Sequence, residues 1–530
     1  MTDNRQTEHA TVTEWSIRPD TRIVATSESL MGEAAHLSYT LAACGLVDRP
    51  PVVTCDDPEE TGEHDIVLGT YAEAAIRPQG FAVIVQDRLT VLAADVDGLF
   101  NGCRYVAQHL IHRRGLTVGQ TYSFAPAVPE RALLLDCGRK YYTPAWIKRL
   151  IREMSWAGLN ALVLHFSEEM GLGLESVTYP WLAGRDGSLC VARDVDTDNR
   201  VLTRDDLRNI ARVAKQYHVE LIPSFDSPGH MNYIVKTYNE HHGVSGLDGI
   251  GNYFHKDGAT SIVQGSRNTA HSRGIDISNP TAVAFARELI TEYATFFHDE
   301  LGCTKFDMGG DELLGWGGVP NNNHTKWQQL DHWAEYARTR SGKDNAVAYD
   351  GFLLFMNDVY ELLSGLGYKS VRMWNDDAYR RRDTGWQEAV GLNPNIEIEY
   401  WSGTENPVSA YLDHRVYNYV NTYNYYVLKE NLIYAGANPA SIYAEWSPFT
   451  YGEDTLRGTD ADRVGGSAFC VWCDDPSFED EDTVLAHIRP MLHAHAAKAW
   501  YPSLPDKIPF ADYEAFVSRI GHAPNAHAEA

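Results

Sequence analysis

The sequence predicts an α/β fold, a (β/α)8 TIM barrel preceded by a small α+β domain. After residue 129, eight short apolar runs alternate with amphipathic helical segments, a pattern typical of a closed parallel barrel. Before residue 129, several strand-like runs and one helix indicate a smaller α+β unit. The chain has 530 residues, which is more than one ordinary domain needs, so at least two domains are expected.

The N-terminal α+β domain is predicted to cover residues 1–128. Apolar residues at helical spacing predict a helix over 98–111. Proline-rich residues 124–130 mark the boundary to the next domain, because prolines are typical of connecting segments. The strand-like runs of this domain are residues 66–69, 81–85 and 89–92.

The barrel domain is predicted to cover residues 129–505, and a C-terminal extension with a disordered tail follows at 506–530. Strands that alternate with helices imply a parallel sheet, and eight such units imply closure. Helix starts are indicated by Pro144, Thr203 and Asn279, which are typical of first turns and caps. The eight strand candidates are residues 132–136, 161–165, 220–225, 304–308, 370–374, 396–400, 416–420 and 466–472.

The charge balance argues against several classes of partner. The chain carries 72 acidic and 45 basic residues, a formal net charge of -27. A polyanion needs a clustered positive surface, so we expect neither nucleic acid nor an anionic membrane as a partner. No run of about 20 apolar residues predicts a membrane span. A neutral sugar meets no such repulsion, and the 13 Trp and 29 Tyr suit stacking on sugar faces, although large enzymes are often rich in aromatic residues.

The cysteines and the first residues predict a cytoplasmic location. Eight cysteines are scattered over the chain, and residues 1–15 are polar, without the apolar run of a signal peptide. A reduced, intracellular setting fits this pattern best. Cys470 and Cys473 have the spacing of a redox pair, but they end an apolar strand, so buried structural thiols are favoured.

The sequence predicts no cofactor and no metal ion. It has no His/Cys cluster with zinc spacing and no glycine-rich phosphate loop with its lysine. Residues 194–198, with Asp205 further on, have the spacing of a calcium loop, but the sixth position is Asn199 rather than glycine. A solvated acidic loop is therefore favoured over a calcium site.

Chemically active side chains follow the predicted strands at their carboxyl ends. Catalytic groups of a (β/α)8 barrel lie at that face, so these side chains are expected to meet at one mouth. Carboxylates for proton transfer, with rings and donors to hold a pyranose, are what a neutral-sugar hydrolase needs. Taken alone, Asp-Glu after Gly-Gly is typical of a helix start. The candidates are Asp136, Arg139, Glu168, Asp226, His230, Asp311, Glu312, Trp374, Trp401, Tyr423, Trp472 and Asp474.

Three motifs carry a resemblance to a known family. They are Arg131-Ala-Leu-Leu-Leu-Asp-Cys-Gly-Arg139, Ile222-Pro-Ser-Phe-Asp-Ser-Pro-Gly-His230 and Gly309-Gly-Asp-Glu312. In order and spacing they resemble the family 20 glycoside hydrolases, the β-N-acetylhexosaminidases, and the likeness runs from about residue 60 to 500. Phe166-Ser-Glu168 and Trp472-Cys-Asp474 resemble the branch of the family that contains lacto-N-biosidases.

The resemblance implies a retaining, substrate-assisted reaction. Glu312 matches the general acid, which protonates the leaving oxygen and later activates water. Asp311 matches the carboxylate that accepts the acetamide N–H and steers the acetamido oxygen onto the anomeric carbon. An oxazolinium-like intermediate forms, and tethering the nucleophile to the substrate gives it a high effective molarity. Glu168 and His230 match a carboxylate–imidazole pair behind the acid.

The resemblance also assigns residues that hold the sugar. Arg139 matches an arginine that binds ring hydroxyls, with a structural salt bridge as the alternative, and Asp474 matches a residue that binds outer hydroxyls. Tyr423 matches the tyrosine that donates to the acetamido carbonyl. Trp374, Trp401 and Trp472 match the aromatic walls of the site, with plain core packing as the alternative.

Four positions depart from the family's pattern and leave the substrate open. Many members carry His where Asp307 stands and Asp where Tyr425 stands. Gly173 replaces a frequent arginine, and Glu168 replaces a common aspartate. None of these departures removes the acid or the orienting carboxylate.

We therefore expect an exo-β-N-acetylhexosaminidase that acts on oligosaccharides or glycoconjugates with terminal N-acetylhexosamine. A lacto-N-biosidase, which releases a galactosyl-N-acetylglucosamine disaccharide, is the closest alternative. The lack of a visible secretion signal favours the exo enzyme, because a biosidase usually meets its glycan outside the cell. A non-catalytic glycan-binding protein is the alternative of another class. The sequence leaves the oligomeric state open, a homodimer included.

Overall fold

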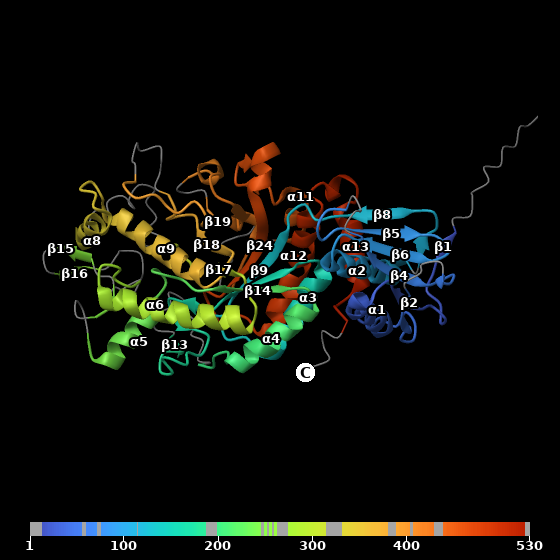
Figure 1. The fold of residues 1–530 in the computed structure, drawn as a ribbon, viewed down its shortest axis with the longest axis horizontal. Coiled ribbons are helices and arrows are strands. Elements are labelled where there is room, and N and C mark those ends of the chain that lie inside the picture. The colour runs from blue at the N-terminus through green and yellow to red at the C-terminus, as the bar shows by residue number, and fades with distance from the viewer. Residues whose placement is uncertain are drawn as a thin grey trace, which may run out of the picture. The chain divides into compact units, whose positions relative to one another are not determined.

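The computed structural model divides the chain into two compact units, Met1–Pro129 with Ser503–Ala530, and Glu130–Pro502 (Figure 1). Each unit is described by itself. The structure describes residues 13–55, 60–71, 76–113, 115–186, 199–244, 249–251, 254–256, 259–261, 274–313, 331–379, 388–402, 406–428 and 438–524.

The first unit contains a six-stranded mixed sheet and three main helices. Strands β2, β3, β4 and β6 run parallel, while β5 and β8 are antiparallel to their neighbours. The sheet order is β3 (Val52–Thr54), β2 (Ile23–Ala25), β4 (Ile66–Thr70), β6 (Leu89–Ala93), β5 (Phe81–Val85) and β8 (Thr121–Phe124). The helices are α1 (Met31–Ala43), α2 (Val96–Arg113) and α13 (Phe510–Ile520). The predicted α+β domain is confirmed.

Two local features of this unit explain its sequence. Gly102 lies in α2 where a Cβ atom would come 2.5 Å from Cγ1 of Val91 in β6, so only glycine lets the helix approach the sheet this closely. Phe516 of α13 contacts the rings of His109 and His112 on α2, with centroids 5.7 and 5.2 Å away. The predicted C-terminal extension from residue 506 therefore contains a packed helix of the first unit. Residues 525–530 of the predicted tail lie outside the described residues.

The second unit is a closed barrel of eight parallel strands. Each strand pairs with its neighbours in parallel, and β24 closes the barrel by pairing with both β20 and β9. A further strand, β21 (Tyr425–Val427), pairs with β24. The barrel strands are β9 (Glu130–Asp136), β10 (Ala161–His165), β14 (Glu220–Ser224), β17 (Lys305–Asp307), β18 (Ser370–Trp374), β19 (Glu397–Tyr400), β20 (Val416–Asn418) and β24 (Val464–Trp472). The predicted TIM barrel is confirmed.

Helices cover the outside of the strands, and their first turns follow the expected capping chemistry. Thr143 Oγ1 accepts from Trp146 N at the start of α3, and Thr203 forms a capping box with Asp206 at the start of α4. Helix α9 lies beside β18, and α6 lies beside α9 (Figure 1). The helices are α3 (Pro144–Ala157), α4 (Arg204–Gln216), α5 (Asn232–His242), α6 (Pro280–Thr295), α8 (Asp331–Ser341), α9 (Ala348–Gly365), α10 (Asn421–Asn424), α11 (Pro439–Glu445) and α12 (Glu481–Trp500).

A paired charge fills the barrel interior near the amino ends of the strands. The guanidinium of Arg372 is fully buried and donates from both Nη atoms to the carboxylate of Glu130, each at 2.7 Å. Lys305 Nζ adds a third bond to Glu130 at 2.9 Å, and the Arg372 guanidinium lies 3.8 Å from the ring centroid of Tyr417. Because these partners satisfy each other, the charges are tolerated away from water.

Across the described parts of the chain, no helix has both the length and the apolar composition that crossing a membrane requires.

Candidate active site

A cavity of about 150 Å³ opens at the carboxyl ends of the barrel strands. Of the candidates named from the sequence, all line it except Asp136, Asp226 and Tyr423. Tyr425 and Val427 complete the wall. The lining residues are Arg139, Glu168, His230, Asp311, Glu312, Trp374, Trp401, Tyr425, Val427, Trp472 and Asp474. Carboxylates, a guanidinium, an imidazole and several rings thus share one small space, as the strand-end pattern predicted.

Asp311 and Glu312 follow a glycine pair that turns the chain into the cavity. Gly309 has a φ of 75°, and a Cβ atom there would come 2.2 Å from Oδ1 of Asp226, so no larger residue fits. Glu312 itself has a φ of 43°, in the left-handed region that non-glycine residues rarely adopt. Backbone strain of this kind is concentrated at functional sites.

His230 joins the two carboxyl groups on one side of the cavity. Its Nε2 lies 3.7 Å from Oδ2 of Asp311 and 3.5 Å from Oε2 of Glu312. Its Nδ1 lies 2.8 Å from Oε2 of Glu168, a buried carboxylate. His230 has a φ of 48°, also left-handed, after the Pro-Gly of the same loop. Glu168 and His230 therefore lie together beside Glu312, in the arrangement that the carboxylate–imidazole pair requires.

The charges behind the cavity balance each other. Oε1 of Glu168 lies 2.7 Å from Arg139 Nη1, which also donates to Asp136 Oδ2 at 2.9 Å. Burial alone would raise the pKa of Glu168, but the charges of Arg139 and His230 hold it well below its usual range. Burial alone would lower the pKa of His230, yet Glu168 and Asp311 hold it well above its usual range. The pairing therefore favours the ionised form of Glu168 and the protonated form of His230.

Asp311 has the opposite perturbation. Burial, which outweighs the favourable charge of His230 and is reinforced by Glu312 and Glu168, raises its pKa to about 6. Among the described residues, Oδ1 of Asp311 has no hydrogen-bond partner. Asp311 is therefore a buried acceptor that ionises close to neutral pH.

Asp376 is a site residue that the sequence analysis missed. Its Oδ2 accepts the backbone N–H of Glu312 at 2.9 Å, and its Oδ1 accepts Nε1–H of Trp401 at 3.1 Å. Burial, together with the charges of Asp377 and Asp311, holds its pKa well above the usual range. Its place two residues after the strand-ending Trp374 was the available signal.

Aromatic rings form part of the cavity wall. Trp401 stacks on Tyr425 with centroids 6.4 Å apart and planes at 10°. Trp472 lies 6.0 Å from Trp374 and 5.9 Å from Tyr425. The guanidinium of Arg139 lies 5.8 Å from the Trp472 ring. Flat apolar faces of this kind match the C–H faces of a pyranose.

Tyr423 was predicted to reach the site, but it is not among the residues that line the cavity. Its side chain is half-buried on the one-turn helix α10, and its hydroxyl donates to Glu445 Oε2 at 2.9 Å. Tyr425 begins β21 and lines the cavity instead. The short helix rotates Tyr423 away from the interior, while the following strand directs Tyr425 and Val427 toward it.

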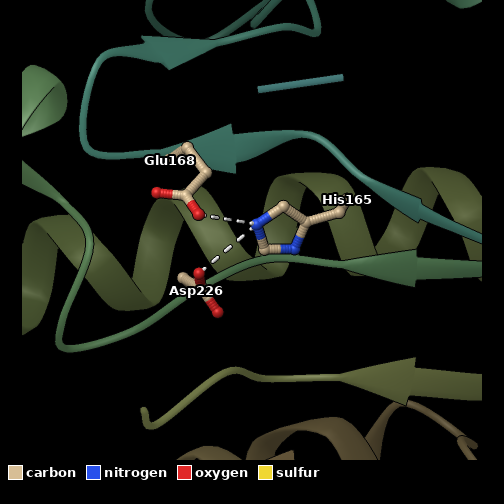
Figure 2. Close-up of side chains that lie close together, drawn as sticks. All are labelled: His165, Glu168 and Asp226. Carbon is tan, nitrogen blue, oxygen red and sulfur yellow. Dashed lines mark hydrogen bonds and ion pairs between the residues drawn. The ribbon is translucent and has the colours of Figure 1, made fainter. Parts of the chain in front are cut away.

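One buried cluster has the ligand types of a metal site. His165, Glu168 and Asp226 bring their donor atoms within 4.8 Å of one another (Figure 2). The carboxylate of Glu168 already binds Arg139 through Oε1 and His230 through Oε2. A metal ion would have to displace these cations, so the cluster fits hydrogen bonding better than metal ligation.

The sequence also raised a calcium loop and a redox pair of cysteines as alternatives. Residues 194–198 of the possible calcium loop lie outside the described residues, and Asp205 pairs with Arg208 in the first turn of α4. Cys470 and Cys473 are buried, and burial holds the pKa of both thiols well above the usual range. A buried thiol that resists ionisation is a poor redox nucleophile.

Comparisons with known proteins agree with this architecture. A family model described as "Glycosyl hydrolase family 20, catalytic domain" matches residues 129–503. The chain is 26% identical over 514 residues to a lacto-N-biosidase of Bifidobacterium bifidum, covering 96% of this chain and 40% of that protein. It is 22% identical over 451 residues to β-hexosaminidase subunit A1 of Dictyostelium discoideum, covering 83% of this chain and 71% of that subunit.

Two solved structures show the same fold. The GH20 β-N-acetylhexosaminidase from Streptomyces coelicolor A3(2) has a TM-score of 0.68 at 19% identity, over 98% of this chain and 94% of that one. The GH20 exo-β-N-acetylglucosaminidase from Vibrio harveyi, solved with N-acetylglucosamine, has a TM-score of 0.70 at 16% identity, over 96% and 74%. At these identities the likeness shows the fold alone.

Proposed function

The chain belongs to glycosyl hydrolase family 20, and we propose that it is an exo-β-N-acetylhexosaminidase that acts through the substrate's own acetamido group. It releases terminal β-linked N-acetylglucosamine or N-acetylgalactosamine and retains the anomeric configuration. One observation carries the proposal. Asp311 and Glu312 meet the same nitrogen of His230 inside a small cavity that is walled by tryptophans.

Glu312 is the proton donor of the first step. It gives its proton to the glycosidic oxygen as the bond from that oxygen to C1 breaks, and the acetamido oxygen forms the new bond to C1. In the second step Glu312 removes a proton from water, which attacks C1 and reopens the oxazolinium ring. The two inversions together retain the configuration. His230 stays beside Glu312 as a cation and stabilises the carboxylate that the first step creates.

Asp311 orients the nucleophile. As a carboxylate it accepts the acetamide N–H, which increases the electron density on the acetamido oxygen and fixes its position. Its Oδ1, for which the described residues provide no hydrogen-bond partner, offers a buried acceptor for that proton.

A protein nucleophile fits this site less well. A carboxylate pair that forms a covalent intermediate lies on opposite faces of the sugar, about 5–5.5 Å apart. Here both carboxyl groups approach one imidazole nitrogen, at 3.7 and 3.5 Å, and they belong to adjacent residues. Both therefore act from one side, which supports attack by a group of the substrate itself.

A lacto-N-biosidase is the second candidate, and the likeness to the Bifidobacterium enzyme favours it. Nitrophenyl β-glycosides of N-acetylglucosamine and of the galactosyl-N-acetylglucosamine disaccharide separate the two. Hydrolysis of the disaccharide glycoside alone would replace the exo assignment.

Variants of the carboxyl pair test the proposal against a non-catalytic glycan-binding protein. Glu312→Gln keeps the shape of the side chain but has no proton to give, so turnover of a poorly activated glycoside should be lost while sugar binding persists. A thiazoline that mimics the cyclised acetamide should bind at least about 100-fold more tightly than N-acetylglucosamine. Unchanged turnover in Glu312→Gln would remove Glu312 from the reaction, and weak thiazoline binding would indicate a protein nucleophile.

We also propose a cytoplasmic location. The seven cysteines that the structure describes are all free thiols, which suits a reducing compartment. Fractionation of the native host, with the activity measured in each fraction, tests this location.

A further inference from the structure

Three polar residues end neighbouring strands of the barrel and lie side by side. His165 ends β10, Ser224 ends β14 and Asp307 ends β17. The strand register pairs His165 with Ser224, and Ser224 with Asp307. Residues paired in this way project from the same face of a sheet. All three side chains are fully buried, so this layer lies inside the barrel, beneath the cavity.

The three side chains form one hydrogen-bonded chain. Ser224 Oγ donates to Asp307 Oδ2 at 2.5 Å and lies 2.8 Å from Nδ1 of His165. A serine hydroxyl has one proton, so when that proton points to Asp307 the serine oxygen must accept from His165. Asp307 is itself fixed, because its Oδ1 accepts the backbone N–H of Gly309 at 2.9 Å. The chain therefore places a proton on Nδ1 of His165.

The other nitrogen of His165, Nε2, faces the carboxyl groups of Glu168 and Asp226. Figure 2 shows Nε2 directed at two carboxyl groups, Glu168 Oε1 at 3.4 Å and Asp226 Oδ2 at 3.5 Å. A bare nitrogen there would oppose the lone pairs of both oxygens. One proton must therefore lie on Nε2 or on Asp226, and in either position it acts as a donor inside the cluster.

We propose that Asp307, Ser224 and His165 are positioning residues for Glu168, and that through Glu168 they set the charge on His230 beside the carboxyl pair. None of the three lines the cavity, so each acts through the next residue in the chain. This inference rests on the proposed function, because it concerns the machinery that serves Asp311 and Glu312. It also gives Asp307, a departure from the family's pattern, a role in the reaction.

Several ionisable groups face this chain from the surrounding elements. Glu168 of β11 (Ser167–Glu168) and Asp226, just after β14, face His165, and His165 also acts electrostatically on Asp311. Arg372 of β18 and Glu399 of β19 act on Asp307 from the barrel interior. Trp472 of β24 covers the His165 ring at 5.2 Å and carries no charge. Any shift that the chain causes must therefore be measured against these fixed neighbours.

The variant Ser224→Ala cuts the chain at its centre. His165 loses the acceptor that fixes its Nδ1–H, so the ring is no longer held in one orientation beside Glu168, and the support that Glu168 gives the cation on His230 weakens. Asp311 then becomes harder to ionise, because the charge of His230 favours its carboxylate. We expect the acidic limb of kcat/KM against pH to move upward by about half a unit or more, with kcat reduced and KM within about twofold. The position of the limb does not depend on how much protein is folded.

A matched control is available on β24. Ser467 is buried, and its Oγ lies 3.2 Å from Nε2 of His495, so Ser467→Ala also removes a buried serine–histidine bond from a barrel strand. His495 does not reach the cluster behind the cavity, since its other nitrogen bonds to Asn424. The acidic limb of Ser467→Ala should match that of the wild type.

Asp307→Asn reverses the direction of the hydrogen bonds made by Ser224 without removing them. The amide oxygen keeps Gly309 N, so the NH2 group faces Ser224, which must then donate its proton to His165. Nδ1 then accepts, so a singly protonated His165 carries its proton on Nε2 and still donates to Glu168. We expect a smaller upward shift than in Ser224→Ala, and the double variant should shift no further than Ser224→Ala alone, because both changes act through the same hydrogen bonds.

Two readouts decide the inference separately from the proposed function. The activity profiles use the nitrophenyl N-acetyl-β-glucosaminide, and histidine-ring NMR follows the titration of His230, which should move to lower pH in Ser224→Ala. The inference would be overturned if the wild type is active but Ser224→Ala changes neither the acidic limb of kcat/KM nor the titration of His230. A wild type that does not cleave the substrate would reject the proposed function, and the NMR titration alone would then decide.

Discussion

The buried side chain of Asp311 should lower the free energy of unfolding at neutral pH, where it is ionised. Burial is the main reason that its pKa rises from 3.8 to about 6, so the fold holds a proton that the unfolded chain would release. A rise of about two units corresponds to about 3 kcal/mol. Because the folded pKa is the higher one, this cost is absent below the unfolded pKa of 3.8, grows as the pH rises to about 6, and is constant above it.

Asp311→Asn removes the charge while keeping the shape. Its thermal and urea midpoints should rise relative to the wild type at about pH 7.5, by an amount that approaches the 3 kcal/mol figure, and should match the wild type at about pH 4. Catalysis should fall sharply at every pH, since an amide is a weaker acceptor for the acetamide N–H. In the wild type, kcat/KM should fall as the pH drops through about 6, where Asp311 takes up its proton.

Asp350 provides a control of opposite sign. It is also buried, but its two oxygens accept from Val347 N at 2.9 Å and Val390 N at 2.7 Å. Asp350→Asn turns one of these acceptors into a donor, so it should cost about 1–3 kcal/mol. An Asp311→Asn protein that is no more stable than the wild type at neutral pH would refute the argument that the buried carboxylate is a cost.

Three further substitutions follow from single contacts. Asp376→Asn has one acceptor oxygen for two donors, so kcat/KM should fall about tenfold, and a loss below twofold in steady-state kinetics would deny its support of Glu312. Tyr425→Phe should weaken hydrolysis while Tyr423→Phe stays within about twofold; the reverse order would restore the sequence prediction. Arg372→Met leaves the charge of Glu130 buried, so the urea midpoint should fall by the equivalent of about 3–5 kcal/mol, and an unchanged midpoint would contradict the pairing.

The barrel could be predicted because its strands are legible in the sequence. Parallel strands covered on both faces appear as continuous apolar runs, and the predicted runs 161–165 and 370–374 coincide with β10 and β18. The start of α3 could be predicted for a similar reason, since Thr143 and Pro144 carry the local chemistry of a helix start. Strand ends in turn indicated which side chains would gather at the mouth.

The features that the sequence did not predict depend on geometry beyond the strand ends. Tyr423 and Tyr425 differ by two residues, and only the single turn of α10 determines which ring reaches the cavity. In the sequence Asp376 does not differ from the other acidic residues. Its hydrogen bond to the backbone of Glu312 joins two segments that are 64 positions apart and meet only in the folded protein. Helix α13 packs on α2 through tertiary contacts that residues 510–520 do not reveal by themselves.

The nucleophile can be tested most directly by making the acetamido oxygen poorer in electrons. Nitrophenyl β-glucosaminides with N-acetyl, N-fluoroacetyl, N-difluoroacetyl and N-trifluoroacetyl groups differ little in size, while each fluorine weakens the amide oxygen as a nucleophile. If that oxygen attacks C1 under the direction of Asp311, kcat/KM must fall at every step of the series. A flat series, in which all four substrates react alike, would contradict the account.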